Sequence, residues 1–376
     1  MAGIYVHIPF CKQACSYCNF HFSTKLQTKE DVLAAIQQEV SLQANYLPQR
    51  QIDTLYFGGG TPSILQAHEI NAIVEAIQNT FSFADDMEIT LEANPDDLTG
   101  DKIKELRSTP INRFSIGIQS FRNTDLQFMN RPHTAHEAYQ AINKSQRAGY
   151  TNMTIDLIYG SPTLPDDAWR ENLHTVFEMG IPHISAYALT VEPGTALNHW
   201  IEKGKVSGID VEQAGRQLEL LMDEMAANGY DHYEISNFCK PGYRAQHNTN
   251  YWFNIPYLGL GAGAHSFNGT TRQWNVANNV KYAKAILHEG KVPFERETLS
   301  LKDRYNETLL TSLRTKWGCH TGILKANFPD QYNNTFAKES ARLLEQGLLQ
   351  KENDHIKLSR KGTLVADSVI ADLFAE

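Results

Sequence analysis

Three cysteines near the N-terminus carry the clearest chemistry in this sequence. Cys11, Cys15 and Cys18 stand in the segment CKQACSYC, a C-x3-C-x2-C spacing that lets three thiolates reach one metal centre from a single loop. Thiolates are the ligands that hold iron–sulfur clusters. Because this segment offers no fourth cysteine, one iron of a cubane cluster would lack a protein ligand and act as a Lewis acid. The spacing therefore predicts a [4Fe-4S] cluster with one open iron.

A zinc site is the alternative reading of the same loop. His7 or His21 could complete a tetrahedron with the three cysteines. Structural zinc usually pins together a small module, whereas this loop follows the first strand of a large α/β domain, so the cluster is favoured. The remaining cysteines, Cys239 and Cys319, are isolated and expected to be packing residues. An odd cysteine count with three members clustered is unlike a secreted disulfide framework and favours a reducing cytoplasm.

Regularly spaced strands are expected to position this loop. Short β-rich runs alternate with amphipathic stretches about every 30 residues up to about residue 190, the pattern of consecutive βα units. The expected strands are residues 3–10, 53–57, 88–92, 113–119, 153–159 and 183–189. They are mostly apolar, as in a parallel sheet enclosed on both faces. The prediction is an α/β fold whose chemistry lies in the loops after the strands.

Polar or glycine-rich segments follow five of these strands and should meet at one rim. The cysteines follow the first strand and GGGTP, residues 58–62, follows the second. Glu92 and Gln119 end the third and fourth strands, and Asp156 lies in the fifth. A glycine triplet lets the backbone approach a ligand closely, although alone it is more often a turn. For the two carboxylates, a helix cap or an ion pair with arginine is the structural alternative.

The chain beyond residue 200 divides into two further parts. A helix is expected at residues 211–228, then an irregular region from 230 to 279 rich in Gly, Asn and aromatic residues. From about residue 300, three helices and a hairpin around residues 347–358 suggest a small α+β domain of winged-helix type. The expected division is 1–230 for a barrel, 231–295 for its extension and 296–376 for the C-terminal domain.

Charge and hydropathy exclude several classes of protein. The formal net charge is -9, and the C-terminal domain has no basic stripe on its presumed recognition helix, so no nucleic-acid binding is expected. The N-terminus MAGIYVHIPF lacks a basic region followed by a long apolar stretch, so no signal peptide is expected, and no long apolar run predicts a spanning helix. The expected location is cytoplasmic.

Four segments together resemble a known family. YVHIPFCKQACSYCNF, GGGTP, LEANP and SIGIQSF look like radical S-adenosylmethionine (radical SAM) proteins related to oxygen-independent coproporphyrinogen III oxidase, and the resemblance covers nearly the whole chain. It implies a partial (β/α)6 TIM-like barrel, a [4Fe-4S] cluster and bound S-adenosylmethionine. Matching positions imply that S-adenosylmethionine is contacted by Tyr5, Tyr17, Gly59, Gly60, Thr61, Glu92, Gln119, Arg131, Asp156, Ala188 and, in the Gly-rich stretch 259–267, His265 or Ala264. Whether one or two molecules bind, and whether either is cleaved, stays open.

Two departures separate the sequence from the authentic oxidase. Phe20 stands where the oxidase has a further cysteine, and the family tyrosine is already Tyr5, without a sizeable N-terminal extension before it. Both put coproporphyrinogen III oxidase activity in doubt. They are instead the pattern of the oxidase-like heme chaperones of the HemW group.

The segment HNTNYW agrees with that group, whose signature is HNxxYW. The resemblance makes the motif a heme-binding candidate through His247, Asn248, Tyr251 and Trp252, with His247 first as axial ligand. The structural alternative is that His247 and Asn248 satisfy backbone groups while the two aromatics pack. Cys239 and the pair Cys319 and His320 are weaker candidates for a heme ligand.

The resemblance implies a heme chaperone that carries heme to hemoproteins, respiratory ones among them, and receives electrons for its cluster from a donor. The alternatives are the oxidase reaction and radical chemistry on an unknown substrate. A homodimer and peripheral contact with a membrane surface stay open as well.

Overall fold

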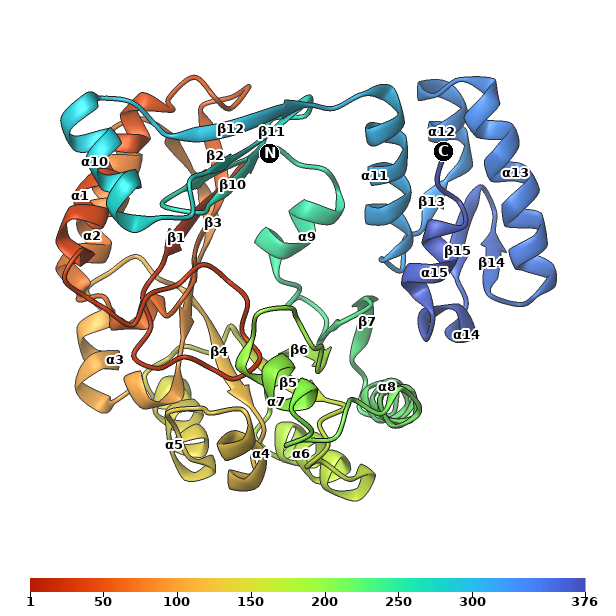
Figure 1. Cartoon of the computed structure of the whole chain (residues 1–376), viewed down its shortest axis with the longest axis horizontal. Helices are drawn as coiled ribbons and strands as arrows, with labels where there is room; N and C mark the ends of the chain where they lie inside the picture. The colour runs from red at the N-terminus through yellow and green to blue at the C-terminus, as the bar shows by residue number, and fades with distance from the viewer. Residues whose placement is uncertain (376) are drawn as a thin grey trace.

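Six parallel strands form the centre of the molecule. The computed structural model describes residues 1–375, and it is drawn in Figure 1. Each of the six strands pairs in parallel with the next along the chain. They are β1 (Gly3–Ile8), β2 (Gln51–Gly59), β3 (Ser82–Ala93), β4 (Arg113–Gln119), β5 (Met153–Tyr159) and β6 (His183–Ala188). The predicted α/β barrel class is confirmed.

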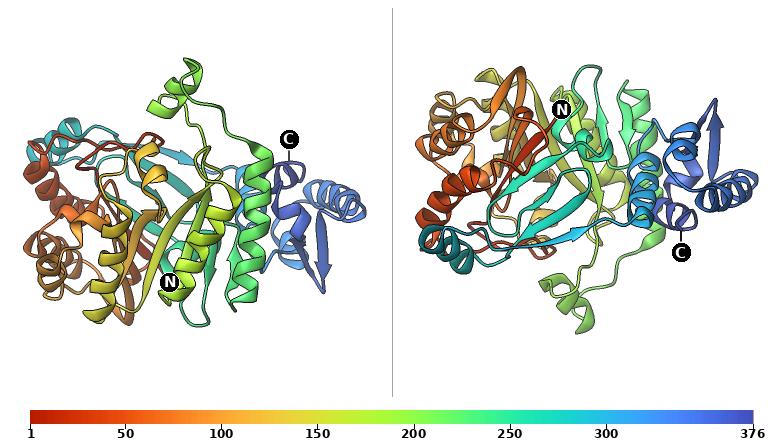
Figure 2. Two further views of the ribbon diagram at one scale, coloured as in Figure 1. Left: turned by 90° about the horizontal axis from the view of Figure 1, so that it is seen from below. Right: turned by 90° about the horizontal axis from the view of Figure 1, so that it is seen from above.

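Helices cover the outer face of these strands, as Figures 1 and 2 show. In order they are α1 (Lys29–Leu42), the short turn η1 (Pro62–Ile64), α2 (Ala67–Gln78), η2 (Pro95–Asp97), α3 (Gly100–Leu106), α4 (Asn123–Phe128), α5 (Ala135–Arg147) and α6 (Asp166–Glu178). Helix α2 illustrates why they dock: Ile70, Ile73, Val74 and Ile77 recur at helical spacing and are all buried. The apolar stripe of each helix thus closes the outer side of the barrel wall.

Short strands extend both edges of the six-stranded core into one sheet of twelve. Beyond β6 lie α7 (Ala196–Glu202), α8 (Val211–Ala227), β7 (Asp231–Glu234) and β8 (Asn237–Cys239); beyond β1 lie α9 (Gln246–Trp252), β9 (Tyr257–Leu260), β10 (His265–Phe267), β11 (Thr271–Asn275), α10 (Asn279–Glu289) and β12 (Phe294–Thr298). In Figure 1 the strands form an open arc around α9. The expectation of an irregular region at 230–279 is wrong, because these short strands are ordered by pairing with β1 and β6.

The C-terminal part has a hydrophobic core of its own, built on Tyr305, Leu309, Phe336 and Leu343. Its elements are α11 (Leu301–Leu313), β13 (Cys319–His320), α12 (Thr321–Asn327), α13 (Asp330–Glu345), β14 (Leu349–Glu352), β15 (His355–Leu358), α14 (Arg360–Thr363) and α15 (Ala366–Ala371). The strands pair antiparallel in the order β13-β15-β14. A helix, a strand, two helices and a hairpin in this order make a winged-helix arrangement, as the sequence predicts.

The C-terminal domain lies against one side of the barrel, next to α8 (Figure 2). Arg360 of α14 contacts α8 through the Asp223 carboxylate at 2.6 Å and the Glu219 carbonyl oxygen at 3.2 Å. Among residues 1–375, no helix is both long and apolar enough to cross a membrane.

Candidate functional site

The three-cysteine loop leaves β1 at the rim of the barrel and is held there by neighbouring loops. Lys12 donates to Asp96, in the turn after β3, at 2.8 Å. Gln13 donates to the Asn130 backbone oxygen at 2.8 Å, and Asn130 donates back to the Ala14 carbonyl at 2.7 Å. Contacts to two different βα loops therefore fix the backbone of the cysteine loop.

The thiols of this loop lie close enough together to influence one another. Burial, reinforced by the neighbouring thiols of Cys18 and Cys15, raises the pKa of Cys11 to about 11. The pKa of Cys18 is also raised, again chiefly by burial. The Arg131 guanidinium donates to the Cys15 sulfur at 3.2 Å. Thiols of this kind become thiolates when a metal centre supplies positive charge.

The residues around the loop fit a cluster better than a single ion. Within residues 1–375, no three His, Cys, Asp or Glu side chains converge closely enough to hold one metal ion. His7 is engaged by the His21 carbonyl at 2.9 Å and the Tyr5 hydroxyl at 3.1 Å. The His21 ring is joined to Asn279 at 2.8 Å. A zinc tetrahedron would require His7 or His21 to leave these partners, whereas a [4Fe-4S] cluster would be held by Cys11, Cys15 and Cys18 without a histidine.

The second predicted segment, GGGTP, packs directly against the cysteine loop. A Cβ atom on Gly60 would lie 2.6 Å from the Phe10 carbonyl oxygen, so only glycine fits at this contact. Gly59 has a φ of 104°, in the region that favours glycine, and its amide donates to Glu92 at 3.2 Å. Glu92 also accepts from the Tyr56 hydroxyl at 2.8 Å. The ends of β2 and β3 are therefore cross-linked beside the loop.

Arg131 connects the third and fourth strands to the cysteines. Besides Cys15, its guanidinium donates to the Asn94 side chain at 2.7 Å and the Gly117 carbonyl at 2.9 Å. Gln119 ends β4 with a φ of 65°. This non-glycine residue in a left-handed conformation marks a sharply turned backbone at the rim.

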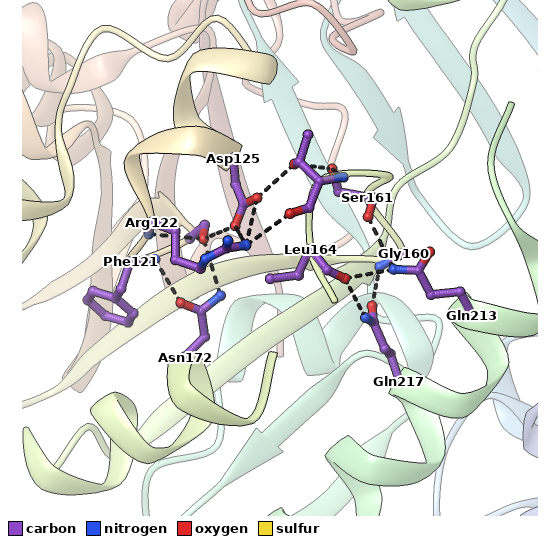
Figure 3. Close-up of polar contacts among 11 residues, drawn as sticks. Phe121, Arg122, Asp125, Gly160, Ser161, Leu164, Asn172, Gln213 and Gln217 are labelled. Atoms are coloured by element: carbon purple, nitrogen blue, oxygen red, sulfur yellow. Dashed lines mark hydrogen bonds and ion pairs between the residues drawn. The ribbon is translucent and has the colours of Figure 1, made fainter. Parts of the chain in front are cut away.

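A buried polar network fixes the loops that follow β4 and β5 (Figure 3). Asp125 accepts from the hydroxyls of Ser120 and Thr163, each at 2.7 Å. Arg122 donates to the Thr163 carbonyl at 2.9 Å. On the other side of the network, Gln217 of α8 accepts from the Gly160 amide at 2.7 Å. The rim is thus rigid next to Gln119.

A pocket of about 190 Å³ lies inside the barrel. Its lining joins predicted S-adenosylmethionine contacts with predicted heme contacts, and consists of Tyr5, Tyr56, Glu92, Ser115, Asp156, Ser185, Tyr187, His247, Asn248 and Tyr251. Several predicted residues are not in this lining: Tyr17, Gly59, Gly60, Thr61, Gln119, Arg131, Ala188, Ala264, His265 and Trp252. Of these, the exposed His265 stacks on Trp274 in the β10 and β11 hairpin, with ring centroids 6.1 Å apart.

Two carboxylates give the pocket its electrostatic character. Burial, together with the nearby Asp156, raises the pKa of Glu92 to about 7, although the Tyr56 and Gly59 hydrogen bonds lower it. Burial likewise raises the pKa of Asp156 to about 6, opposed by the Ser185 hydroxyl and by Arg113. When both carboxylates are ionised the pocket attracts cations; when protonated they can donate hydrogen bonds.

The lining also includes residues that the sequence reasoning missed. Tyr56 belongs to β2, and Ser115, Ser185 and Tyr187 belong to β4 and β6. Ser115 pairs with Glu92 across β3 and β4, and Ser185 pairs with Asp156 across β5 and β6. Their polar type within apolar strands was the available signal in the sequence, whereas their alignment with the two carboxylates depends on strand register.

Comparison with known proteins first defines the class. Residues 5–176 match the Radical SAM superfamily, and residues 299–365 match the HemN C-terminal domain. The solved structure of coproporphyrinogen III oxidase from Escherichia coli superposes with a TM-score of 0.85 at 22% identity, over 100% of this chain and 90% of that one. At this identity the superposition shows a shared fold. The protein is therefore of the radical SAM class, a superfamily that implies a [4Fe-4S] cluster and S-adenosylmethionine.

Comparison with full-length relatives then defines the family. The heme chaperone HemW of Bacillus subtilis is 30% identical over 100% of both chains. That of Lactococcus lactis is 32% identical over 97% of this chain and 95% of the relative. The chain belongs to the family of the heme chaperones HemW.

Proposed function

We propose that this protein binds a [4Fe-4S] cluster through Cys11, Cys15 and Cys18, holds S-adenosylmethionine beside it, and carries heme to recipient hemoproteins. The observation that carries the proposal is the three-cysteine loop, held by Lys12 and Arg131 at the rim beside GGGTP. Family membership supplies heme as the cargo. Radical SAM proteins are not all chaperones, so delivery must be tested separately from cofactor binding.

Each part of the site has a definable task in this proposal. The reduced cluster with bound S-adenosylmethionine would supply one-electron chemistry or a conformational signal. Arg131 offsets thiolate charge at Cys15. Gly60 lets the β2 loop approach the cysteine loop without a clash. Glu92 and Asp156 offer acceptors to the hydroxyls and the positive charge of a bound ligand. The other residues that are predicted to contact S-adenosylmethionine are proposed to surround the same bound molecule.

The proposed function also requires residues that contact heme. A pocket of about 190 Å³ is smaller than the roughly 300–1,000 Å³ typical of sites for drug-sized ligands, so S-adenosylmethionine and a porphyrin would both have to extend beyond it. His247, Asn248, Tyr251 and Trp252 stay the predicted contacts of the cargo. To ligate iron, His247 would have to release one of its two ring hydrogen bonds.

The oxidase reaction is the competing function. The shared fold favours it as the second candidate. Phe20, at the position of the oxidase's further cysteine, is 67% exposed beside the cysteine loop and offers no thiol. We therefore propose that decarboxylation of coproporphyrinogen III is absent. We further propose that the cluster receives electrons from a donor, that the heme recipients include respiratory hemoproteins, and that the protein is cytoplasmic, contacts a membrane surface and forms a homodimer.

The test uses anaerobically reconstituted full-length protein. In one arm heme is added and its retention through gel filtration is measured, followed by transfer to an apo-hemoprotein. In the other arm coproporphyrinogen III, S-adenosylmethionine and a reductant are added and protoporphyrinogen is measured. Retention and transfer without decarboxylation support the chaperone; turnover to protoporphyrinogen identifies an oxidase. The triple variant of Cys11, Cys15 and Cys18 to Ala is the control, and iron and sulfide retained by it would refute the cluster site.

A further inference from the structure

Helix α9, which carries the HNTNYW segment, is anchored at its start by a buried ion pair. The Glu88 carboxylate of β3 accepts from the backbone amides of Gln246 and His247, each at 3.0 Å. The Arg113 guanidinium lies 3.8 Å from Glu88, and both side chains are buried. The first turn of α9 is therefore fixed to the barrel wall.

One face of α9 closes the barrel pocket. His247 is only 2% exposed, and both of its ring nitrogens are engaged, Nδ1 with the Thr54 hydroxyl at 2.8 Å and Nε2 with the Tyr251 hydroxyl at 2.9 Å. Its ring stacks on Tyr56 with centroids 5.1 Å apart. These contacts set where Tyr251 and Asn248 stand in the pocket wall.

The C-terminal end of α9 and the residues that follow it contact the C-terminal domain. The guanidinium of Arg314, just after α11, lies over the Trp252 ring at 5.3 Å. Phe253 packs on Trp317 with centroids 4.9 Å apart. Asn254 donates to the Thr311 hydroxyl at 3.2 Å. Trp252, the last residue of α9, and the two residues that follow it thus contact α11 and the turn after α11.

We propose that α9 couples ligand binding in the barrel pocket to the docking of the C-terminal domain, with His247 as the positioning residue that sets the pocket wall. The inference rests on the proposed binding of S-adenosylmethionine in the barrel. In this proposal, a ligand that contacts Asn248 or Tyr251 shifts the C-terminal end of α9, beyond the turn that Glu88 anchors, and this end contacts Arg314 and Trp317. Displacement of α9 therefore changes the contacts of α11. In this role His247 keeps both hydrogen bonds and does not ligate iron.

Hydrogen exchange and heme spectra test the coupling on the full-length, cluster-loaded protein. In the wild type, S-adenosylmethionine should change amide exchange in residues 301–318. His247→Leu removes both ring hydrogen bonds and should weaken S-adenosylmethionine binding about tenfold. Trp252→Ala should leave the affinity for S-adenosylmethionine within about twofold. It should reduce the exchange response, because it removes the contact of the Trp252 ring with Arg314 of the C-terminal domain. Trp252→Phe keeps an aromatic face and should restore part of the response, and His288→Leu, exposed on α10, is the matched control.

The outcomes separate this inference from the proposed function. Wild-type protein that holds the cluster and S-adenosylmethionine, yet shows no exchange response in residues 301–318, overturns the coupling and leaves the proposed function intact. Wild-type protein that binds no S-adenosylmethionine overturns both. In heme-loaded protein, the position of the Soret band should be the same in His247→Leu and the wild type. A shifted Soret band in His247→Leu that is absent in His288→Leu identifies His247 as the iron ligand and refutes its positioning role.

Discussion

Replacement of Glu39 by Gln is expected to remove a pH dependence from the stability of the barrel. Glu39 lies in α1 and has no exposed surface. Its carboxylate accepts from the Gly261 amide at 2.8 Å, the Asn275 side chain at 2.7 Å and the Tyr282 hydroxyl at 2.5 Å. These bonds tie α1 to the Gly-rich loop after β9 and to α10, so the carboxylate holds one edge of the site in place.

The sign of the effect follows from the pKa of this group. Burial raises the pKa of Glu39 to about 7, although the Tyr282, Gly261 and Asn275 hydrogen bonds lower it. An unfolded glutamate has a pKa of about 4.3. The folded state therefore holds the proton more tightly, and the stability contributed by protonated Glu39 is complete below about pH 4 and lost as the pH rises to about 7. At about 1.4 kcal/mol per pH unit, the loss is on the order of 3 kcal/mol.

Urea unfolding measures this loss directly. Wild type, Glu39→Gln and the exposed control Glu75→Gln are unfolded between about pH 5 and about pH 8, and the free energy of unfolding is obtained by linear extrapolation. The free energy of unfolding of Glu39→Gln, minus that of the wild type, should rise by about 2–3 kcal/mol across this range. The wild type loses stability as Glu39 ionises, whereas glutamine cannot ionise. Glu75→Gln should show no such trend. A difference that stays constant with pH, or falls, would refute the assigned role of Glu39.

Three further substitutions test other contacts. Arg131→Lys keeps the charge but loses the planar fork that reaches Cys15, so S-adenosylmethionine affinity, measured by equilibrium dialysis, should fall about tenfold or more; unchanged affinity contradicts the arrangement. Glu88→Ala leaves Arg113 buried without its partner and should cost about 3–5 kcal/mol in urea unfolding, and a cost below about 1 kcal/mol would argue against the anchor. Gly60→Ala should lower the iron content after reconstitution, because its Cβ meets a backbone oxygen of the cysteine loop; full cluster loading would rule out the close approach.

The sequence predicts the six-stranded core well because each buried strand is a local apolar run bounded by turn residues. Strands β4 and β5 begin and end at the residues expected, 113–119 and 153–159. The strands added at the edges have 3–5 residues, too few to show a period, and they exist because β1 and β6 present free edges. Their formation depends on tertiary contacts, which no local sequence pattern predicts.

The site likewise has a part that the sequence predicts and a part that it does not. The three cysteines and GGGTP are contiguous motifs, so spacing alone predicts their loops. Tyr56, Ser115 and Ser185 enter the pocket through strand register, which depends on how β2, β4 and β6 align with their neighbours. The anchor of α9 was also beyond sequence reasoning, since Glu88 and His247 are 159 positions apart. Contacts between residues that are far apart in the sequence cannot be predicted from the spacing of motifs.

The size and polarity of the barrel pocket bear on how one chain could handle both S-adenosylmethionine and heme. The pocket is lined by two carboxylates and several hydroxyls, which suit the positive charge and the polar groups of S-adenosylmethionine. A porphyrin is larger and mostly apolar, so in the proposed function it contacts His247, Asn248 and Tyr251 of the pocket wall while most of its surface lies outside the pocket. Communication between the barrel pocket and the C-terminal domain then needs an element that contacts both. Helix α9 meets this requirement, because His247 lies against the pocket while Trp252 lies against Arg314 of the C-terminal domain.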